Sequence, residues 1–227
     1  MENFTDRLEI LYGAEGVSKL ENAAVAVVGV GGVGGFAAEA IARAFVGRIV
    51  LIDADVVAPS NVNRQIIAFP STVGQGKADL MKERIERINP DCHVTALKLF
   101  VTEENLPSIQ ALGEADVIVD AIDSVPSKVA LILEAVKRGK RIVSSMGAAN
   151  REDCTAFRAA DISEAHTCPL AKKIRRQLAA SGVTEGVRVV FSTEKPKSFG
   201  GALGSNSFTP AAAGLAAASE AIKSILR

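Results

Sequence analysis

The chain has 227 residues, of which 48% are hydrophobic and 23% charged, enough to bury the core of one domain. Its 26 basic and 26 acidic residues balance, so a nucleic-acid partner would need a local basic patch and is not indicated by overall charge. Tryptophan is absent and tyrosine occurs once, which leaves few aromatic side chains on which the bases of a single strand could stack.

The cysteines and the termini predict a cytoplasmic protein. Cys92, Cys154 and Cys168 are widely spaced and form no C-x-x-C pair, which argues against a structural zinc site and against a disulfide framework. The first residues are polar and partly acidic, unlike a secretory signal peptide, and the apolar segment 208–226 is interrupted by proline, serine and charged residues. We therefore expect no stable membrane insertion.

A glycine-rich turn carries the strongest functional signal. Residues 23–28 are an unbroken apolar run typical of a buried strand, and apolar residues recur at helical spacing from 36 onward. Between them, glycines leave backbone N–H groups free at a helix N-terminus, where phosphate binds well; they are Gly29, Gly31, Gly32 and Gly34. Asp53 follows about 20 residues later, where a carboxylate can bind ribose hydroxyls. The pattern predicts nucleotide binding without separating NAD from ATP.

Strands and helices then alternate along the chain. The pattern predicts a strand at 49–52, a helix at 76–89, a strand at 93–99, a helix near 103–112, a strand at 117–119, a helix at 126–138 and a strand at 141–144. Such alternation is typical of an α/β fold with a doubly wound, mostly parallel, Rossmann-like sheet. Ligands of these sheets bind at the carboxyl ends of the strands.

The last third of the chain departs from this alternation. We expect a C-terminal helix–strand–loop–helix extension, with a basic helix at 170–179, a strand at 187–192, a loop at 193–209 and a closing alanine-rich helix. The loop is longer than ordinary connections, which favours a lid or a mobile segment. We divide the chain into a nucleotide-binding core, 1–150, and a substrate-side extension, 151–227, packed on the core as a single domain overall.

Further motifs follow the glycine loop in a fixed order. They are Asp53-x-Asp55, Asn61-x-x-Arg64-Gln65, Val73-Gly74-x-x-Lys77, Ile88-Asn89-Pro90 and Asp120-x-x-Asp123. With this set the chain resembles the ubiquitin-activating superfamily, whose members are ATP-dependent carboxylate adenylating enzymes. The resemblance implies ATP and Mg²⁺ as cofactors in place of NAD.

The resemblance also implies roles for individual residues. Arg64 and Lys77 would place positive charge beside the triphosphate, and Asp123 would coordinate the magnesium that bridges the phosphates. Asp55 would be a second polar contact or help to hold the metal, and Asn61 would hydrogen-bond to phosphate or to nearby loop backbone. The alternatives are exposed surface cations for Arg64 and Lys77 and a helix cap for Asp123.

Arg7 matches an N-terminal arginine of the superfamily's bacterial homodimers, where it reaches the ATP phosphates bound by the partner. The resemblance therefore implies a homodimer whose sites are completed by Arg7 of the second copy. A single arginine near the start of the chain is by itself also compatible with an ordinary exposed position.

Within the superfamily, the sulfur-carrier activators usually carry two C-x-x-C pairs, which this chain lacks, and the ubiquitin-activating enzymes need a large inserted domain. The chain looks most like the tRNA threonylcarbamoyladenosine dehydratases, on the matching residues Asp120–Ser124, Lys128, Cys168–Ala171, Arg175 and Val190–Glu194. The resemblance implies that ATP activates the threonine carboxylate of a modified tRNA nucleoside and that a neighbouring carbamoyl atom closes a ring. An intramolecular attack requires no enzyme nucleophile.

The substrate side leaves alternatives open. A basic cluster in and after the helix at 170–179 favours tRNA binding, with a merely solvated helix face as the alternative; it comprises Lys172, Lys173, Arg175, Arg176, Lys195 and Lys197. Cys168 lies beside a helix start that would lower the pKa of a thiol, so it is either a nucleophile or a structural residue. We interpret His166 as a surface or capping residue.

Two other functions remain at this point. One is an adenylating enzyme for a small sulfur-carrier or ubiquitin-like protein that needs no zinc, and the other is a non-catalytic or NAD-binding Rossmann protein. A sulfurtransferase or cysteine desulfurase partner also remains open.

Overall fold

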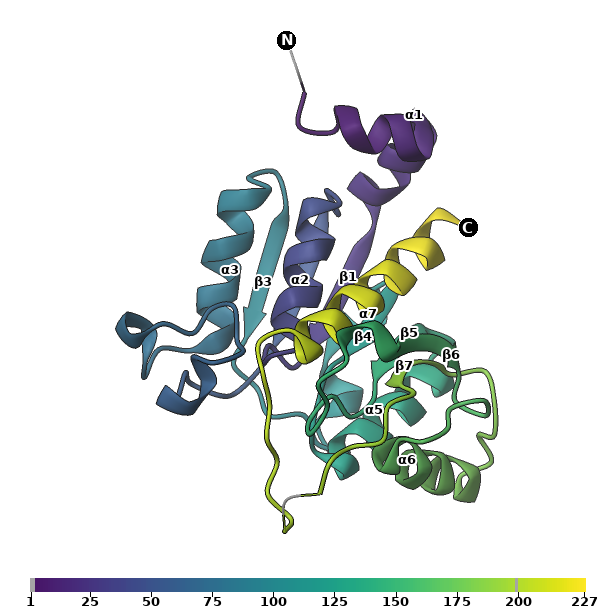
Figure 1. The fold of residues 1–227 in the computed structure, drawn as a ribbon. Coiled ribbons are helices and arrows are strands. Elements are labelled where there is room, and N and C mark those ends of the chain that lie inside the picture. Colours follow the sequence, from purple (N-terminus) through teal and green to yellow (C-terminus); the bar gives the residue numbers. More distant parts are fainter. Residues whose placement is uncertain (1–2, 199) are drawn as a thin grey trace.

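The computed structural model describes residues 3–198 and 200–227, in which seven strands form one sheet (Figure 1). The strands are β1 (Ala24–Val28), β2 (Arg48–Ile52), β3 (His93–Leu97), β4 (Val117–Asp120), β5 (Arg141–Ser145), β6 (Phe157–Asp161) and β7 (Arg188–Ser192). Their order is β3-β2-β1-β4-β5-β7-β6, and every neighbouring pair is parallel except β6 with β7. The predicted α/β fold with a mostly parallel sheet is confirmed.

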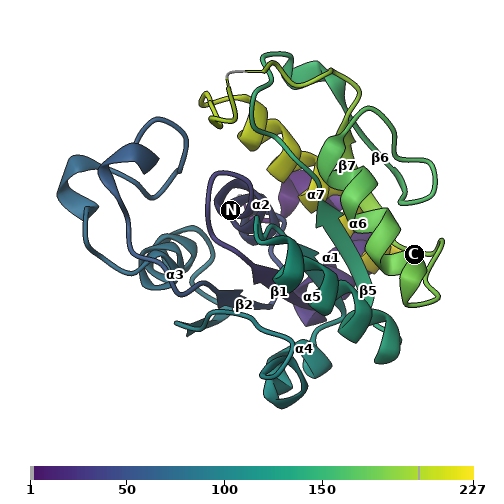
Figure 2. The ribbon, with the colours of Figure 1, turned by 90° about the horizontal axis from the view of Figure 1, so that it is seen from below.

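Helices cover both faces of this sheet. One face carries α1 (Asp6–Asn22), α2 (Gly34–Arg43), α3 (Lys77–Ile88) and α7 (Thr209–Leu226), and the other carries α4 (Gln110–Glu114), α5 (Val125–Lys137) and α6 (Pro169–Ala180). In Figure 2, α4 lies on the far side of β1 and β2 from α2 and α3. The sheet is therefore wound on both sides, which leaves the carboxyl ends of its strands for a ligand.

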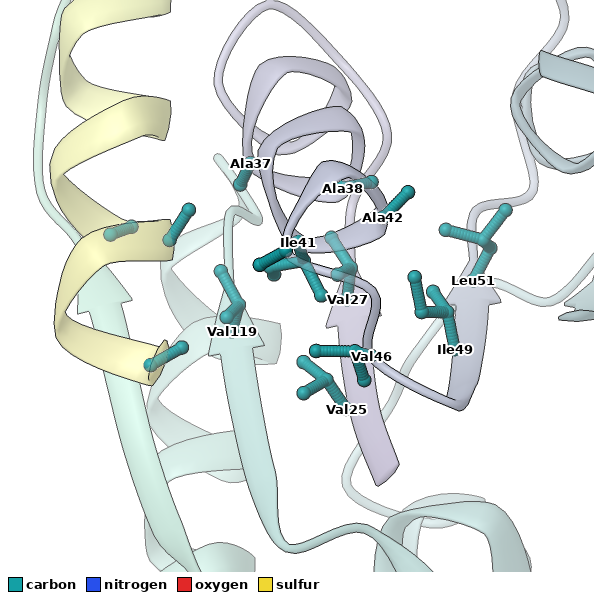
Figure 3. Close-up of a cluster of buried hydrophobic side chains, with 14 of the residues drawn as sticks. Val25, Val27, Ala37, Ala38, Ile41, Ala42, Val46, Ile49, Leu51 and Val119 are labelled. Carbon is teal, nitrogen blue, oxygen red and sulfur yellow. The ribbon is translucent and has the colours of Figure 1, made fainter. Parts of the chain in front are cut away.

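The central strands are apolar throughout because both of their faces are buried. Val25 and Val27 point to the side of α2, where they pack with Ile41 (Figure 3). Ala26 and Val28 belong to a second core under α5 and α6. Since successive side chains of a strand point to opposite faces, a strand covered on both sides needs an unbroken apolar run.

Helix α7 packs along α2 and across the strands of the second half of the sheet. Gly214 permits this approach, since a Cβ at that position would overlap the carbonyl oxygen of Val33 in the glycine loop. The contact brings the start of α7 against the loop that follows β1. Within the described residues no helix, α7 included, has the length and apolarity that crossing a membrane requires.

Two elements differ from the sequence pattern. The helix expected near 103–112 is replaced by a short 3₁₀ turn, Leu106–Ser108, and α4, because Pro107 has no N–H to donate and Ile109 has extended backbone. Strand β6 was not predicted; only its first residue, Phe157, is buried, so this edge strand lacks a buried apolar run. Its pairing with β7 extends the sheet of the core into the C-terminal third. The division at residue 150 stays a prediction.

Candidate active site

A cavity of about 770 Å³ opens where the chain leaves the carboxyl ends of β1, β2, β4 and β5. Its walls come from the segments 28–33, 52–55, 121–123 and 145–151, from the start of α6, and from 196–198 and 201–205. In Figure 1 these loops lie at the lower end of the sheet. Cavities of this size at this place in an open α/β sheet are typical binding sites for small molecules.

The glycine loop between β1 and α2 forms one wall. Gly29 has φ +89°, and a Cβ there would lie 2.8 Å from the carbonyl oxygen of Ala121. A Cβ on Gly34 would overlap the carbonyl oxygen of Gly29, so Gly34 serves the tight turn and does not itself line the cavity. Gly31 differs, since its Cβ would meet nothing closer than the Gln65 amide nitrogen at 3.7 Å. The loop is therefore tightly packed at Gly29 and Gly34, whereas Gly31 has free space on the side of the cavity.

Asp53, at the end of β2, fixes this loop. One carboxylate oxygen accepts a 2.6 Å hydrogen bond from the Val30 N–H, and the other accepts a 2.8 Å bond from the Asp55 N–H. Asp53 lines the cavity at the same time. The structure gives this residue a clear role in holding the glycine loop, and its contact with a ribose stays a prediction.

Two predicted cations line the cavity together. Lys77 begins α3 with its side chain only 7% exposed, and its Nζ lies 2.7 Å from a carboxylate oxygen of Asp55, which is 67% exposed. Arg64 donates from one guanidinium nitrogen to the Ser60 carbonyl at 2.8 Å and to the Asn63 side-chain oxygen at 2.9 Å. Contacts with Asp55, Ser60 and Asn63 therefore hold both cations at the cavity wall.

Asp123 is an exposed residue of the same cavity, just beyond β4. It does not serve as the cap of α5, which begins after Ser124 without a side-chain capping bond. Among the described residues no three or more His, Cys, Asp or Glu side chains gather as a metal site. A magnesium ion at Asp123 would therefore take most of its ligands from phosphate oxygens and water.

A buried ion pair lies directly behind this wall. Lys128 and Asp120 are both fully buried, with Nζ 2.8 Å from the carboxylate. The Ser144 hydroxyl donates to the same carboxylate oxygen at 2.6 Å, and Lys128 also donates to the Ser145 carbonyl at 2.9 Å. The sequence motif included Asp120 and Lys128 but did not reveal this pairing, which ties β4, α5 and β5 together next to the cavity.

Two predicted site residues lie outside the cavity wall. The side chain of Asn61 accepts a 3.0 Å hydrogen bond from the Ala58 N–H and closes a turn. Arg7 is exposed on α1, and α1 lies at the end of the sheet away from the cavity loops (Figure 1). Within a single copy the structure does not bring Arg7 to the other predicted residues, and its role, like that of Asn61 toward phosphate, stays a prediction.

The two candidates Cys168 and His166 lie in different surroundings, one at the cavity and one on the surface. Cys168 is 3% exposed and lines the cavity at the start of α6. His166 lies on the surface, where its ring meets that of Phe191 edge-on at 5.2 Å and its Nδ1 is 2.8 Å from the Thr167 hydroxyl. The interpretation of His166 as a surface residue therefore agrees with its position.

Sequence reasoning missed the wall that follows β5. Residues 145–151 line the cavity, among them Gly147 and the buried Arg151. The signal for this wall was present, because a predicted parallel strand at 141–144 must deliver its next residues to the ligand end of the sheet. Gln65, buried and lining the cavity, was likewise noted only as part of a motif.

The fold and this cavity define a class: an α/β enzyme that binds a nucleotide with a glycine loop and holds two cations and an exposed carboxylate beside it. The ThiF family model matches residues 5–227, and the chain belongs to the ThiF family. The superfamily resemblance inferred from the motifs is thereby confirmed.

Particular members of that family are similar over most of the chain. The tRNA threonylcarbamoyladenosine dehydratase of Bacillus subtilis is 51% identical over 190 residues, which are 84% of this chain and 74% of that protein. The Escherichia coli protein of the same name is 41% identical over 191 residues, 81% of this chain and 71% of that protein. A crystal structure of the E. coli dehydratase in complex with ATP matches with a TM-score of 0.90 at 38% identity, covering 96% of this chain and 91% of that one.

Proposed function

We propose that this protein catalyses the ATP-dependent dehydration of threonylcarbamoyladenosine in tRNA. The observation that carries the proposal is the similarity, over most of the chain, to two bacterial dehydratases of that substrate. The cavity supports it, because it joins a glycine loop, Arg64, Lys77 and Asp123 to a second wall from β5 and α6.

The proposed reaction removes one water from the threonylcarbamoyl group. Activation forms a bond between a carboxylate oxygen of the threonine and a phosphorus of ATP, with pyrophosphate or ADP as the leaving group. When the ring closes, the bond between that oxygen and the carboxylate carbon breaks, and the oxygen leaves with AMP or phosphate. An atom of the carbamoyl group then forms the ring bond to the carboxylate carbon and loses its proton to solvent. Because the attack is intramolecular, its effective molarity is high, and the buried Cys168 is not needed as a nucleophile.

ATP fits the first wall of the cavity. The open space over Gly31 and the positive start of α2 suit phosphate oxygens, and Asp53 holds the loop in that shape. Lys77 and Arg64 then supply positive charge that stabilises the departing phosphates. Asp55, which is largely exposed, can release Lys77 to the phosphates without leaving a buried charge behind.

Magnesium belongs to the same proposal. Asp123 would hold Mg²⁺ against the phosphate oxygens, with Asp55 as a second carboxylate within the cavity. Bound Mg²⁺ supplies charge stabilisation of the phosphates during the transfer.

A homodimer would bring Arg7 to the site of the other copy. Helix α1, which carries Arg7, and the residues just before it expose apolar side chains that a second copy would cover: Phe4 is 81% exposed, Ile10 78% and Leu11 68%. Symmetric homodimers are the commonest soluble assemblies, and they place the same surface of both copies in contact.

The tRNA would approach across α6 and the loop before α7. Lys172, Lys173 and Arg176 are exposed, whereas Arg175 is partly engaged, donating to the Ala165 carbonyl at 2.5 Å. The loop 193–208, of which Phe199 lies outside the described residues, supplies cavity-lining residues at 196–198 and 201–205. We propose that it acts as a lid over bound substrate.

The function is tested by incubating the protein with ATP, Mg²⁺ and tRNA that carries threonylcarbamoyladenosine, followed by nucleoside mass spectrometry. The expected result is a nucleoside lighter by one water, formed only when ATP is present. An unchanged nucleoside would overturn the proposal. ATP-dependent adenylation of a small protein ending in Gly-Gly, or tight NAD binding without an ATP response, would point to the two other functions.

The proposal also covers the protein's location in the cell and a further protein partner. The described cysteines Cys92, Cys154 and Cys168 are free thiols, which suits a cytoplasmic location. A sulfurtransferase or cysteine desulfurase partner would be identified by co-purification with the tagged protein. The dehydration chemistry itself needs no sulfur donor, so activity in a purified system would separate the reaction from such a partner.

A further inference from the structure

A buried arginine with an unused donor stands on the second wall of the cavity. Arg151 is 3% exposed; its Nη1 donates to the Ala149 carbonyl at 3.0 Å and its Nε to the Glu194 carbonyl at 3.4 Å. Its Nη2 is buried and has no hydrogen-bond partner among the described residues. Arg151 is therefore a buried cation whose donors the described residues do not all use.

The arginine borders a recess over Gly147. A Cβ placed on Gly147 would lie 3.5 Å from the Arg151 Nη1, 3.6 Å from the Cys168 sulfur and 3.7 Å from the Leu170 Cβ. All four residues line the cavity. The recess is therefore a small space with a guanidinium on one side and a thiol and an apolar side chain on the others.

This recess is separate from the wall assigned to ATP. The glycine loop follows β1 and the segment containing Gly147 and Arg151 follows β5, with β4 between them in the sheet. ATP beside Arg64 and Lys77 would therefore leave the recess to a second ligand that carries an acceptor group.

We propose that Arg151 and the recess over Gly147 bind the free carboxylate of the acyl substrate and hold it for activation. The inference rests on the proposed function, which supplies a carboxylate of this kind as the threonyl end of the modified nucleoside. A carboxylate that approaches the phosphates of ATP is repelled by their charge. The permanently charged guanidinium, whose Nη1 borders the recess and carries a second N–H besides the one donated to Ala149, offsets this repulsion and fixes the direction from which the oxygen approaches.

Two variants of Arg151 test its part. Arg151→Met keeps a long apolar side chain and removes the charge, whereas Arg151→Lys keeps the charge without the planar fork. The measurements are the affinity for tRNA with threonylcarbamoyladenosine, the affinity for the same tRNA with unmodified adenosine, and the affinity for ATP. We expect Arg151→Met to weaken binding of the modified tRNA by about 10- to 100-fold, the usual effect of losing a charged hydrogen bond. Binding of unmodified tRNA and of ATP should not change, and lysine should restore part of the loss.

A merely structural arginine would behave differently. Its loss would weaken the binding of both tRNAs equally, or would lower the affinity for ATP and the melting temperature. The preference for the modified tRNA over the unmodified one would stay intact. That result would overturn the assignment of Arg151.

Gly147→Ala tests the recess without touching the arginine. The added methyl meets its neighbours at ordinary contact distances, so the fold should be preserved, but the recess is filled. We expect a raised KM for the modified tRNA with ATP affinity unchanged, and an unchanged KM would overturn the recess as the binding place. If wild-type protein neither prefers the modified tRNA nor dehydrates it, the proposed function fails. If it does both and Arg151→Met does so equally well, only this inference fails.

Discussion

The buried pair Lys128–Asp120 offers a sharp test of what holds the active-site walls together. Both side chains are fully buried, and Nζ lies 2.8 Å from the carboxylate. In Lys128→Met the carboxylate of Asp120 would keep only the Ser144 hydroxyl at 2.6 Å and the Ile122 N–H at 3.0 Å as donors. Removing one partner of a buried pair leaves an uncompensated charge and costs about 3–5 kcal/mol.

The expected loss is large enough to measure without ambiguity. For a chain of this size about 1 kcal/mol lowers Tm by roughly 2–4 °C, so Lys128→Met should melt roughly 6–20 °C below wild type. Asp120→Asn should lose stability by a similar mechanism, since the buried ammonium then lacks its counter-charge.

The double variant, Lys128→Met with Asp120→Asn, completes a double-mutant cycle. Because no unpaired charge remains, it should be more stable than the sum of the two single losses predicts, by about 1–3 kcal/mol. Urea unfolding followed by far-ultraviolet circular dichroism measures each free energy, and equal m-values would establish that the same transition is compared. Single variants that lose under about 1 kcal/mol, or strictly additive losses, would refute the reasoning.

Three further predictions concern function. Lys77→Ala should lose turnover while its fold is retained, whereas Lys82→Ala, on the exposed face of the same helix, should be fully active; full turnover of the first variant would remove Lys77 from the mechanism. Arg7→Ala and Asp123→Ala should each be nearly inactive alone and recover activity when mixed and allowed to exchange subunits, and no recovery despite proven exchange would argue against Arg7 acting across a dimer. Alanine at the three exposed cations of α6 should reduce the salt dependence of tRNA binding by about one unit of slope for each lost phosphate contact and leave ATP affinity unchanged; an unchanged slope would make that face merely solvated.

Much of the fold and of the first cavity wall could be predicted because their signals are local. The apolar run of β1, the glycines after it and Asp53 are close in sequence. The glycines are needed where the backbone leaves no room for a side chain, and Asp53 accepts a hydrogen bond from the backbone of the same loop. Lys77 could be placed because a helix start at that point follows from the pattern of α3. The family likewise followed from ordered motifs within residues 23–150.

The features that the sequence did not predict depend on how separate elements of the chain pack against one another. Nothing local in the sequence pairs Lys128 with Asp120 and Ser144, because the helix between the two strands must first pack on the sheet. Arg151 was not singled out, since an arginine after a strand is usually exposed, whereas here it is buried and donates to the carbonyl of the distant Glu194. Edge strand β6 has no buried apolar run because it lies at the edge of the sheet, where most of its residues stay partly exposed.

The buried pair and the second wall together suggest why the site can be precise. Activation of a carboxylate requires that its oxygen and the phosphorus it attacks be held at a fixed separation. The phosphate wall follows β1 and β2 and the Arg151 wall follows β5, and β4 lies between β1 and β5. Lys128 binds Asp120 at the end of β4 and the Ser145 carbonyl at the end of β5, so it locks the two strand ends between these walls. A variant such as Lys128→Met would therefore loosen the spacing of the site as well as the fold, and its surviving folded fraction should show a reduced kcat with ATP affinity retained.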